Sequence, residues 1–139
     1  MIQLNDLLTS SGSYPDRAKS KELTKEVLDN AKTLLEKVNS LLKDLGITNV
    51  KLSSGFRPSS VNASIANAAK KSAHMICKAL DIIDDKDQTI GKLVSSKPEL
   101  LRKYGLFIED LGSTKGKNTN WVHLDIVDRK DRPSRSFKP

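Results

Sequence analysis

One stretch of the chain, residues 23–45, has the spacing of a long amphipathic helix. Its apolar residues recur at intervals of three and four, which places them on one stripe of a helix surface. They are Leu23, Val27, Ala31, Leu34, Val38, Leu41 and Leu45. Gly46 follows at once and suits the left-handed conformation that ends many helices. The rest of the chain must therefore supply a surface that buries this stripe.

The segments after this helix predict short strands interspersed with short helices. We expect strands within 50–56, 79–83, 105–110 and 120–127, and helices within 87–96 and 98–105. In the last strand, strict alternation puts Trp121, His123 and Asp125 on one face and an apolar set on the other. This order is typical of an α+β fold with a small antiparallel sheet packed against helices.

The chain length fits a single domain over residues 1–139, which can bury a core without disulfides. We expect residues 1–20 to form an extended arm on this domain and residues 128–139 to form a basic tail. Cys77 is the only cysteine, which fits folding in a reducing cytosol. No apolar run approaches the roughly 20 residues of a membrane span, and the first residues do not resemble a secretory signal.

The net charge of +7 implies attraction to polyanions, although most of it is expected to be ordinary solvated surface. Nucleic acid and the anionic bacterial envelope are both candidates. A nucleic-acid binder has little support, because no known motif is present and the chain has only one Trp, two Tyr and three Phe. We expect no nucleic-acid partner.

The only two histidines lie in two short stretches, SAHMICKALDIID (72–84) and NWVHLDIV (120–127). In one continuous helix, His74 and Asp81 would sit about 10.5 Å apart along the axis, close to the limit for sharing an ion. A shared metal therefore requires the chain to turn between them, with Asp81 on a strand. Two imidazoles and one carboxylate form a common ligand set of catalytic zinc. On spacing alone, a purely structural role is the more common case.

Three motifs in order add to this interpretation: SSGFRP (53–58), SAHMICKALD (72–81) and WVHLD (121–125). Together they resemble the zinc D-Ala-D-Ala carboxypeptidase superfamily (peptidase family M15, subfamily A), which includes the hedgehog signalling domain, D-alanyl-D-alanine dipeptidases and many phage endolysins. Its pattern is an SGxR turn, then S-x-H-x-x-G-x-A-x-D, then a strand with W-x-H. The resemblance is strongest to short phage-encoded members and implies a hedgehog-like fold.

The resemblance implies a role for each matching residue. His74, Asp81 and His123 would hold one zinc ion per chain. Arg57 would hold a substrate carbonyl or carboxylate, a task that suits its planar fork of donors; a structural salt bridge is the alternative. Ser72 and Trp121 would line the substrate pocket.

Two positions depart from the pattern. Cys77 replaces the glycine of the second motif, and we interpret it as a packing residue. Asn120 stands where many relatives have a catalytic Glu or Asp, and an amide cannot accept a proton from water. We therefore expect Glu109 to be the general base, because its strand would pair with the last strand. Asp110 is the second choice, and both could also be plain surface carboxylates.

Asp125 shares a strand face with His123, and we expect it either to orient a metal ligand or to be an alternative catalytic acid. By resemblance, the protein is a zinc-dependent peptidase acting on stem or crosslink peptides of peptidoglycan, as a phage endolysin or virion-associated wall hydrolase. We expect a monomer made in the host cytoplasm without a signal peptide. The alternative is a catalytically inactive, zinc-stabilised phage structural or binding module.

Overall fold

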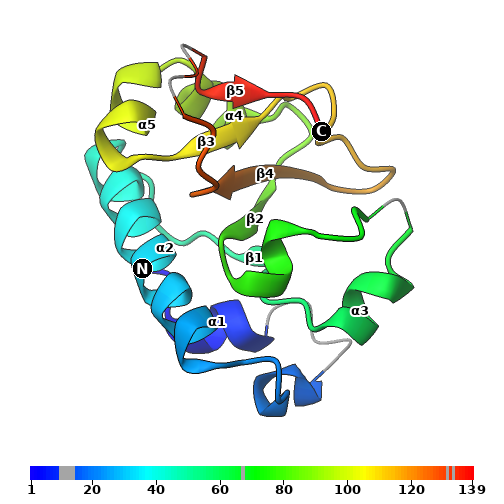
Figure 1. The fold of residues 1–139 in the computed structure, drawn as a ribbon. Coiled ribbons are helices and arrows are strands. Elements are labelled where there is room, and N and C mark those ends of the chain that lie inside the picture. The colour runs from blue at the N-terminus through cyan, green and yellow to red at the C-terminus, as the bar shows by residue number, and fades with distance from the viewer. Residues whose placement is uncertain (10–14, 67, 131, 133) are drawn as a thin grey trace.

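The computed structural model describes residues 1–9, 15–66, 68–130, 132 and 134–139 and confirms an α+β fold (Figure 1). The helices are α1 (Leu4–Thr9), α2 (Lys25–Asp44), α3 (Ser59–Ser64), α4 (Thr89–Ser95) and α5 (Pro98–Tyr104), with two short 3-10 helices, η1 (Pro15–Lys19) and η2 (Ala73–Ile76). The strands are β1 (Leu52–Ser54), β2 (Ala79–Asp84), β3 (Phe107–Glu109), β4 (Asn120–Asp125) and β5 (Ser136–Phe137).

Helix α2 is the long amphipathic helix that the periodicity predicts. It begins at a Thr24 cap, whose hydroxyl oxygen accepts a hydrogen bond from the backbone N–H of Val27 at 3.3 Å. Gly46, just past its end, has a φ of +67°, as expected for a left-handed cap. The stripe packs against the sheet and forms the centre of the core. Its fully buried members are Ala31, Leu34, Val38 and Leu41.

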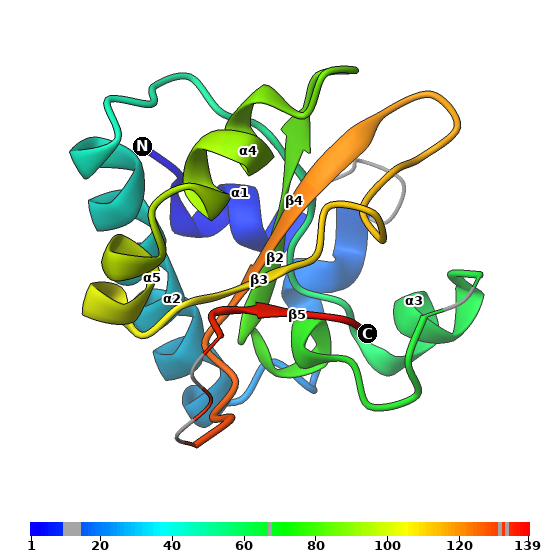
Figure 2. The same cartoon turned by 90° about the horizontal axis from the view of Figure 1, so that it is seen from above.

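The five strands form one sheet in the order β1-β2-β4-β3-β5. All neighbouring pairs are antiparallel except β3 and β5, which are parallel, so the sheet is mixed rather than wholly antiparallel. Helices α2, α4 and α5 gather on one side, and α3 lies on the other (Figure 2). Val122 and Leu124 of β4 point into the core beneath α2. The opposite face of β4, which carries His123, is therefore turned away from the core.

The two ends of the chain differ from the expectation of an extended arm and a polar tail. Residues 4–9 and 15–19 are helical, while the predicted arm at 10–14 lies outside the described residues. The buried amide of Asn39 bonds to both the N–H and the carbonyl of Ile2, and Leu7 is fully buried, so the α2 surface holds this segment. In the basic tail, residues 136–137 form β5 beside β3. Among the described residues, no helix has both the length and the apolar character needed to cross a membrane.

Candidate active site

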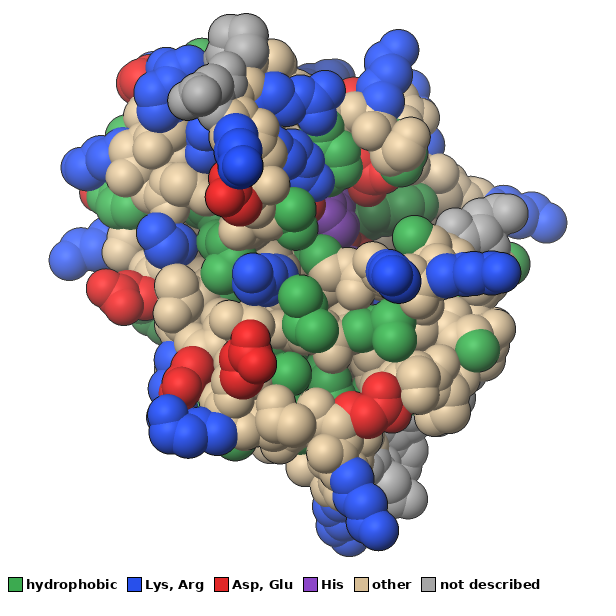
Figure 3. Space-filling view, viewed as in Figure 1, with side chains coloured by type: hydrophobic (Ala, Val, Ile, Leu, Met, Phe, Trp, Pro, Cys, Tyr) green, Lys and Arg blue, Asp and Glu red, His purple; other side chains and the backbone are tan. Residues whose placement is uncertain are grey.

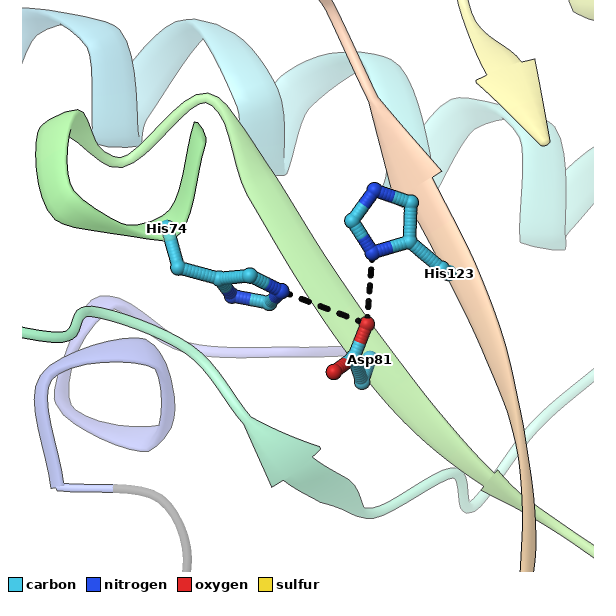
Figure 4. A group of neighbouring side chains, drawn as sticks. All are labelled: His74, Asp81 and His123. Atoms are coloured by element: carbon cyan, nitrogen blue, oxygen red, sulfur yellow. Dashed lines mark hydrogen bonds and ion pairs between the residues drawn. The ribbon is translucent and has the colours of Figure 1, made fainter. Parts of the chain in front are cut away.

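The three predicted metal ligands converge from separate elements, as Figure 4 shows. His74 comes from η2, Asp81 from β2 and His123 from β4. Oδ1 of Asp81 lies 3.4 Å from Nε2 of His74 and 2.8 Å from Nδ1 of His123. One potential ligand atom from each residue lies within 4.8 Å of the other two. The arrangement therefore has the composition and the spacing of a three-ligand metal site.

Strand pairing and a turn create this convergence. The antiparallel register places Asp81 directly opposite His123. On the other side, the hydroxyl of Ser72 accepts a hydrogen bond from the backbone N–H of His74 at 3.2 Å and starts η2. The chain then turns at Cys77, which has a left-handed φ of +56°, and enters β2. The turn between His74 and Asp81 that a shared ion requires is present.

The conformation of Cys77 also accounts for its place in the motif. The superfamily pattern has glycine here, and glycine adopts a positive φ more readily than other residues. The Cys77 side chain is fully buried, and burial raises the pKa of its thiol to about 12. A thiol held neutral is a poor metal ligand, and Cys77 does not belong to the three-residue cluster.

Hydrogen bonds fix the orientation of both imidazoles. Nδ1 of His74 lies 2.9 Å from the carbonyl oxygen of Gly55, so it donates its proton there and leaves Nε2 facing Asp81. Nε2 of His123 lies 3.1 Å from Oδ2 of Asp125, which leaves Nδ1 facing Asp81. An edge of a zinc tetrahedron with bonds of about 2.1 Å measures about 3.4 Å. The His74–Asp81 separation of 3.4 Å equals that value, and the His123–Asp81 separation of 2.8 Å is shorter, so the three residues form a possible metal site whose donor types suit zinc.

Charge around Asp81 favours its ionised form. Burial alone would raise the pKa of this carboxyl, but His74 and His123 outweigh burial and hold the pKa well below its usual range. Burial lowers the pKa of His74. Burial also opposes protonation of His123, but hydrogen bonds to Asp125 and Asp81 raise its pKa to about 10. Without a metal, the Asp81 carboxylate is thus paired with a protonated His123, and a metal ion held by both residues would displace that proton.

A second layer of contacts lies behind His123. Asp125 is 1% exposed. Arg129 donates two hydrogen bonds to its carboxylate, from Nη1 to Oδ1 at 2.6 Å and from Nη2 to Oδ2 at 3.0 Å. The Arg129 guanidinium carbon lies 3.7 Å from the ring centroid of Phe137, whose ring also meets the His123 ring edge-on at 5.8 Å. Sequence reasoning missed Arg129 and Phe137. The signals available were an arginine four residues after Asp125 and the one aromatic residue of the polar tail.

Arg57 contacts the cluster, whereas Ser72 and Trp121 lie on the elements that carry His74 and His123. Nη2 of Arg57 is 3.3 Å from Oδ2 of Asp81, and its Nε donates to Oγ of Ser54 at 2.8 Å. Arg57 therefore forms an ion pair with the cluster, and its role towards a substrate stays a prediction. The Ser72 hydroxyl caps η2, as described above, and Trp121 is partly buried on the His123 face of β4.

Asn120, at the usual position of the catalytic acid, and the two candidate acids Asp110 and Glu109 have different surroundings. The Asn120 side chain donates to the backbone carbonyls of Asp85 and Lys86, at 3.1 and 3.3 Å, and so connects the start of β4 to the loop that follows β2. Asp110 accepts a hydrogen bond from the Ser113 hydroxyl at 2.6 Å, within a turn. Glu109 stands at the end of β3, which pairs with β4 as expected.

The surroundings of Glu109 link it to the cluster. Its side chain is half-buried, and burial is the main reason that its pKa is raised. The negative charges of Asp81, Asp110 and Asp125 raise the pKa further, while His123 lowers it. Glu109 therefore shares the electrostatic environment of two cluster residues, which is typical of functional carboxylates.

The cluster is accessible from one face of the molecule. The His123 side chain is 13% exposed, whereas His74 is almost fully buried. Figure 3 shows a histidine at the bottom of a hollow between hydrophobic and acidic side chains. The cluster is therefore open to solvent on this side.

Comparison with known proteins shows which family the chain resembles. A family model described as Peptidase M15 matches residues 13–125, a segment that contains all three motifs and the whole cluster. Comparison with curated proteins and with solved structures gave no match. Because the match covers most of the chain, the protein belongs to the peptidase M15 family.

Proposed function

We propose that the protein is a zinc metallopeptidase in which His74, Asp81 and His123 hold one zinc ion and Glu109 is the general base. The observation that carries the proposal is the convergence of two imidazoles and one carboxylate within 4.8 Å in a chain of the M15 family. Two nitrogen donors and one carboxylate suit zinc, and three protein ligands leave a fourth position for solvent or substrate.

When bound, zinc would supply Lewis acidity towards the attacking water and the scissile carbonyl. Glu109 would accept the proton of that water and deliver it to the leaving amine. Its raised pKa supports this role, because a base works best when its pKa is near the working pH. Asp125 would hold His123 in the tautomer whose Nδ1 is free to bind, through the 3.1 Å contact at Nε2.

We propose that Arg57 holds the substrate. One side of its guanidinium is used by Asp81 and Ser54. In the described part of the chain, its Nη1 has no hydrogen-bond partner, so it is available for a carbonyl or carboxylate oxygen next to the metal. Trp121, on the same face as His123, would provide an apolar wall.

The substrate class that we propose is a stem or crosslink peptide of peptidoglycan, cleaved by an endolysin or virion-associated hydrolase of a phage. Two observations support this choice: the three motifs resemble enzymes that act on D-amino-acid peptides, and the net charge of +7 favours an anionic wall. A D,D-peptidase and an L-Ala-D-Glu peptidase both fit this class.

A second candidate is a zinc-stabilised module without catalytic activity, which the amide at Asn120 favours. The test compares the wild type, Glu109→Gln and Asp110→Asn for zinc content and for digestion of purified sacculi. The proposal expects one zinc per chain in all three and a loss of about 10²–10⁴-fold in hydrolysis for Glu109→Gln alone.

The matched variant Asp110→Asn removes the neighbouring carboxylate and should retain wild-type hydrolysis. His123→Ala should lose both zinc and activity. A wild type that binds one zinc but releases no new amine terminus from sacculi would favour the inactive module. Equal losses in Glu109→Gln and Asp110→Asn would refute the assignment of the base.

A further inference from the structure

A second cavity, of about 580 Å³, lies next to the C-terminal segment and has a strongly basic lining. Its charged lining residues are Arg102, Asp128, Arg129, Lys130, Arg132 and Arg135. In Figure 3, basic side chains gather on the upper part of the visible face, over β5 and the segment that leads to it. The cavity lies outside the metal cluster, although Arg129 belongs to both regions.

Arg135 is held in place by uncharged groups. Its Nε donates to the carbonyl oxygen of Leu106 at 2.9 Å, and its guanidinium carbon lies 3.8 Å from the ring centroid of Phe107. In the part of the chain that the structure describes, no carboxylate pairs with Arg135. The guanidinium is thus fixed in position, with its terminal nitrogens left for another acceptor.

The charges around Arg135 repel one another. Burial lowers the pKa of Arg135, and the positive charges of Arg102 and Arg129 lower it further. Among the described residues, Asp125 pairs with Arg129, and one oxygen of Asp128 accepts the backbone N–H of Lys130 at 2.9 Å. In the described lining of this hollow, five cationic side chains face one carboxylate, Asp128, and this excess of positive charge favours binding of an external anion.

We infer that this cavity binds phosphate groups of an anionic phosphodiester polymer of the bacterial cell wall. A guanidinium fork matches two oxygens of a phosphate, and neighbouring cations stabilise its charge. The identity of the polymer rests on the proposed function, because an enzyme acting on peptidoglycan would meet such polymers beside its substrate. Arg129 separates the cavity from Asp125 and His123, so a bound polymer would hold the hollow of the metal cluster close to the wall.

Nucleic acid, the other abundant phosphodiester, fits less well. Binding of single strands relies on aromatic rings on which bases stack. The two rings near the cavity, Phe107 and Phe137, already carry the guanidinium groups of Arg135 and Arg129. Among its described lining residues, the cavity therefore offers charge for phosphates, and its one aromatic ring, Phe107, already stacks with Arg135.

The test measures binding of purified poly(glycerol phosphate) and of single-stranded DNA with the same number of phosphates, at low and high salt. Arg135→Gln and Arg102→Gln should each weaken polymer binding about tenfold or more, because a charge-assisted hydrogen bond contributes about 1.5–3 kcal/mol. Lys32→Gln, on the exposed side of α2, makes the same charge change and should alter binding less than twofold. High salt should weaken binding in every case.

Thermal unfolding of each variant shows whether the fold survives, and Arg102→Gln decides the result if Arg135→Gln does not fold. Equal effects of all three substitutions would overturn the inference, because binding would then follow net charge alone. Tighter binding of DNA, with the same dependence on Arg135, would overturn the choice of polymer.

Hydrolysis of a soluble stem peptide, measured on the same preparations, separates this inference from the proposed function. Arg102→Gln and Arg135→Gln should cleave that peptide at the wild-type rate. Polymer binding by a wild type that cleaves nothing would support the cavity and refute the peptidase. Cleavage of the soluble peptide without polymer binding would support the peptidase and refute the proposed binding cavity.

Discussion

The contact between Asp125 and His123 yields the sharpest prediction, because it concerns a residue that does not reach the metal position itself. Asp125→Asn keeps the side-chain volume and one acceptor oxygen but removes the negative charge. His123 then loses its charged acceptor at 3.1 Å, and Arg129 loses a two-bond partner at 2.6 and 3.0 Å. We expect zinc affinity to fall about 10–100-fold, the usual effect of removing such an outer contact.

The same substitution should also lower the free energy of unfolding of the zinc-free protein. Hydrogen bonds to charged groups contribute about 1.5–3 kcal/mol, and Asp125 is almost fully buried. The loss should lie within this range rather than above it, since Arg129 keeps its contact with Phe137 and remains partly exposed. Arg129→Gln, which leaves Asp125 in place, serves as the matched variant.

The assay has two parts. Competition with a chromophoric chelator gives the zinc affinity, and urea unfolding in the presence of excess chelator gives the stability without zinc. In the double variant, the two stability losses should not add, because both single substitutions break the same ion pair. Wild-type zinc affinity in Asp125→Asn, within twofold, would refute the argument that Asp125 fixes the orientation of His123.

Two further predictions concern Glu109 and Cys77. The pKa of Glu109 is raised above 4.5, and its basic form is present only above that shifted pKa, so hydrolysis should fall as the pH drops through it. A pH–rate profile tests this, and Asp110→Asn should keep the same acidic limb. A wild-type acidic limb centred at or below 4.5 would contradict the assignment of Glu109 as the base. Cys77→Ala should still bind one zinc per chain, because the buried thiol is not expected to be a ligand. If metal analysis shows a loss of zinc in a variant that stays folded by circular dichroism, Cys77 is a ligand after all.

Local patterns predict the parts of this fold that depend on one segment at a time. The period of the stripe in α2 and the alternation in β4 each follow from residues close together in the chain, and both elements form as expected. The turn between His74 and Asp81 follows from a distance argument alone. The pairing of β3 with β4 was also predictable, because the two strands are consecutive in sequence.

The parts that sequence reasoning misses depend on contacts between distant segments. Helix α1 has only six residues, too short to be stable alone, and its segment is held through Asn39, which lies 37 residues from Ile2. Strand β5 has two residues and exists because it pairs with β3. No local pattern could therefore place Phe137 beside His123.

The surroundings of Asp125 favour Glu109 over Asp125 as the proposed general base. Both oxygens of Asp125 are occupied: Oδ1 accepts from Arg129 and from the backbone N–H of Val127, and Oδ2 accepts from Arg129 and His123. Burial opposes this charge, but the hydrogen bonds outweigh burial and lower the pKa of Asp125. A carboxylate with a lowered pKa and no free oxygen is a weak proton acceptor. Glu109 has the opposite properties, a raised pKa and a half-exposed side chain, so the sheet gives the two carboxylates different environments, which supports Glu109 as the proposed base.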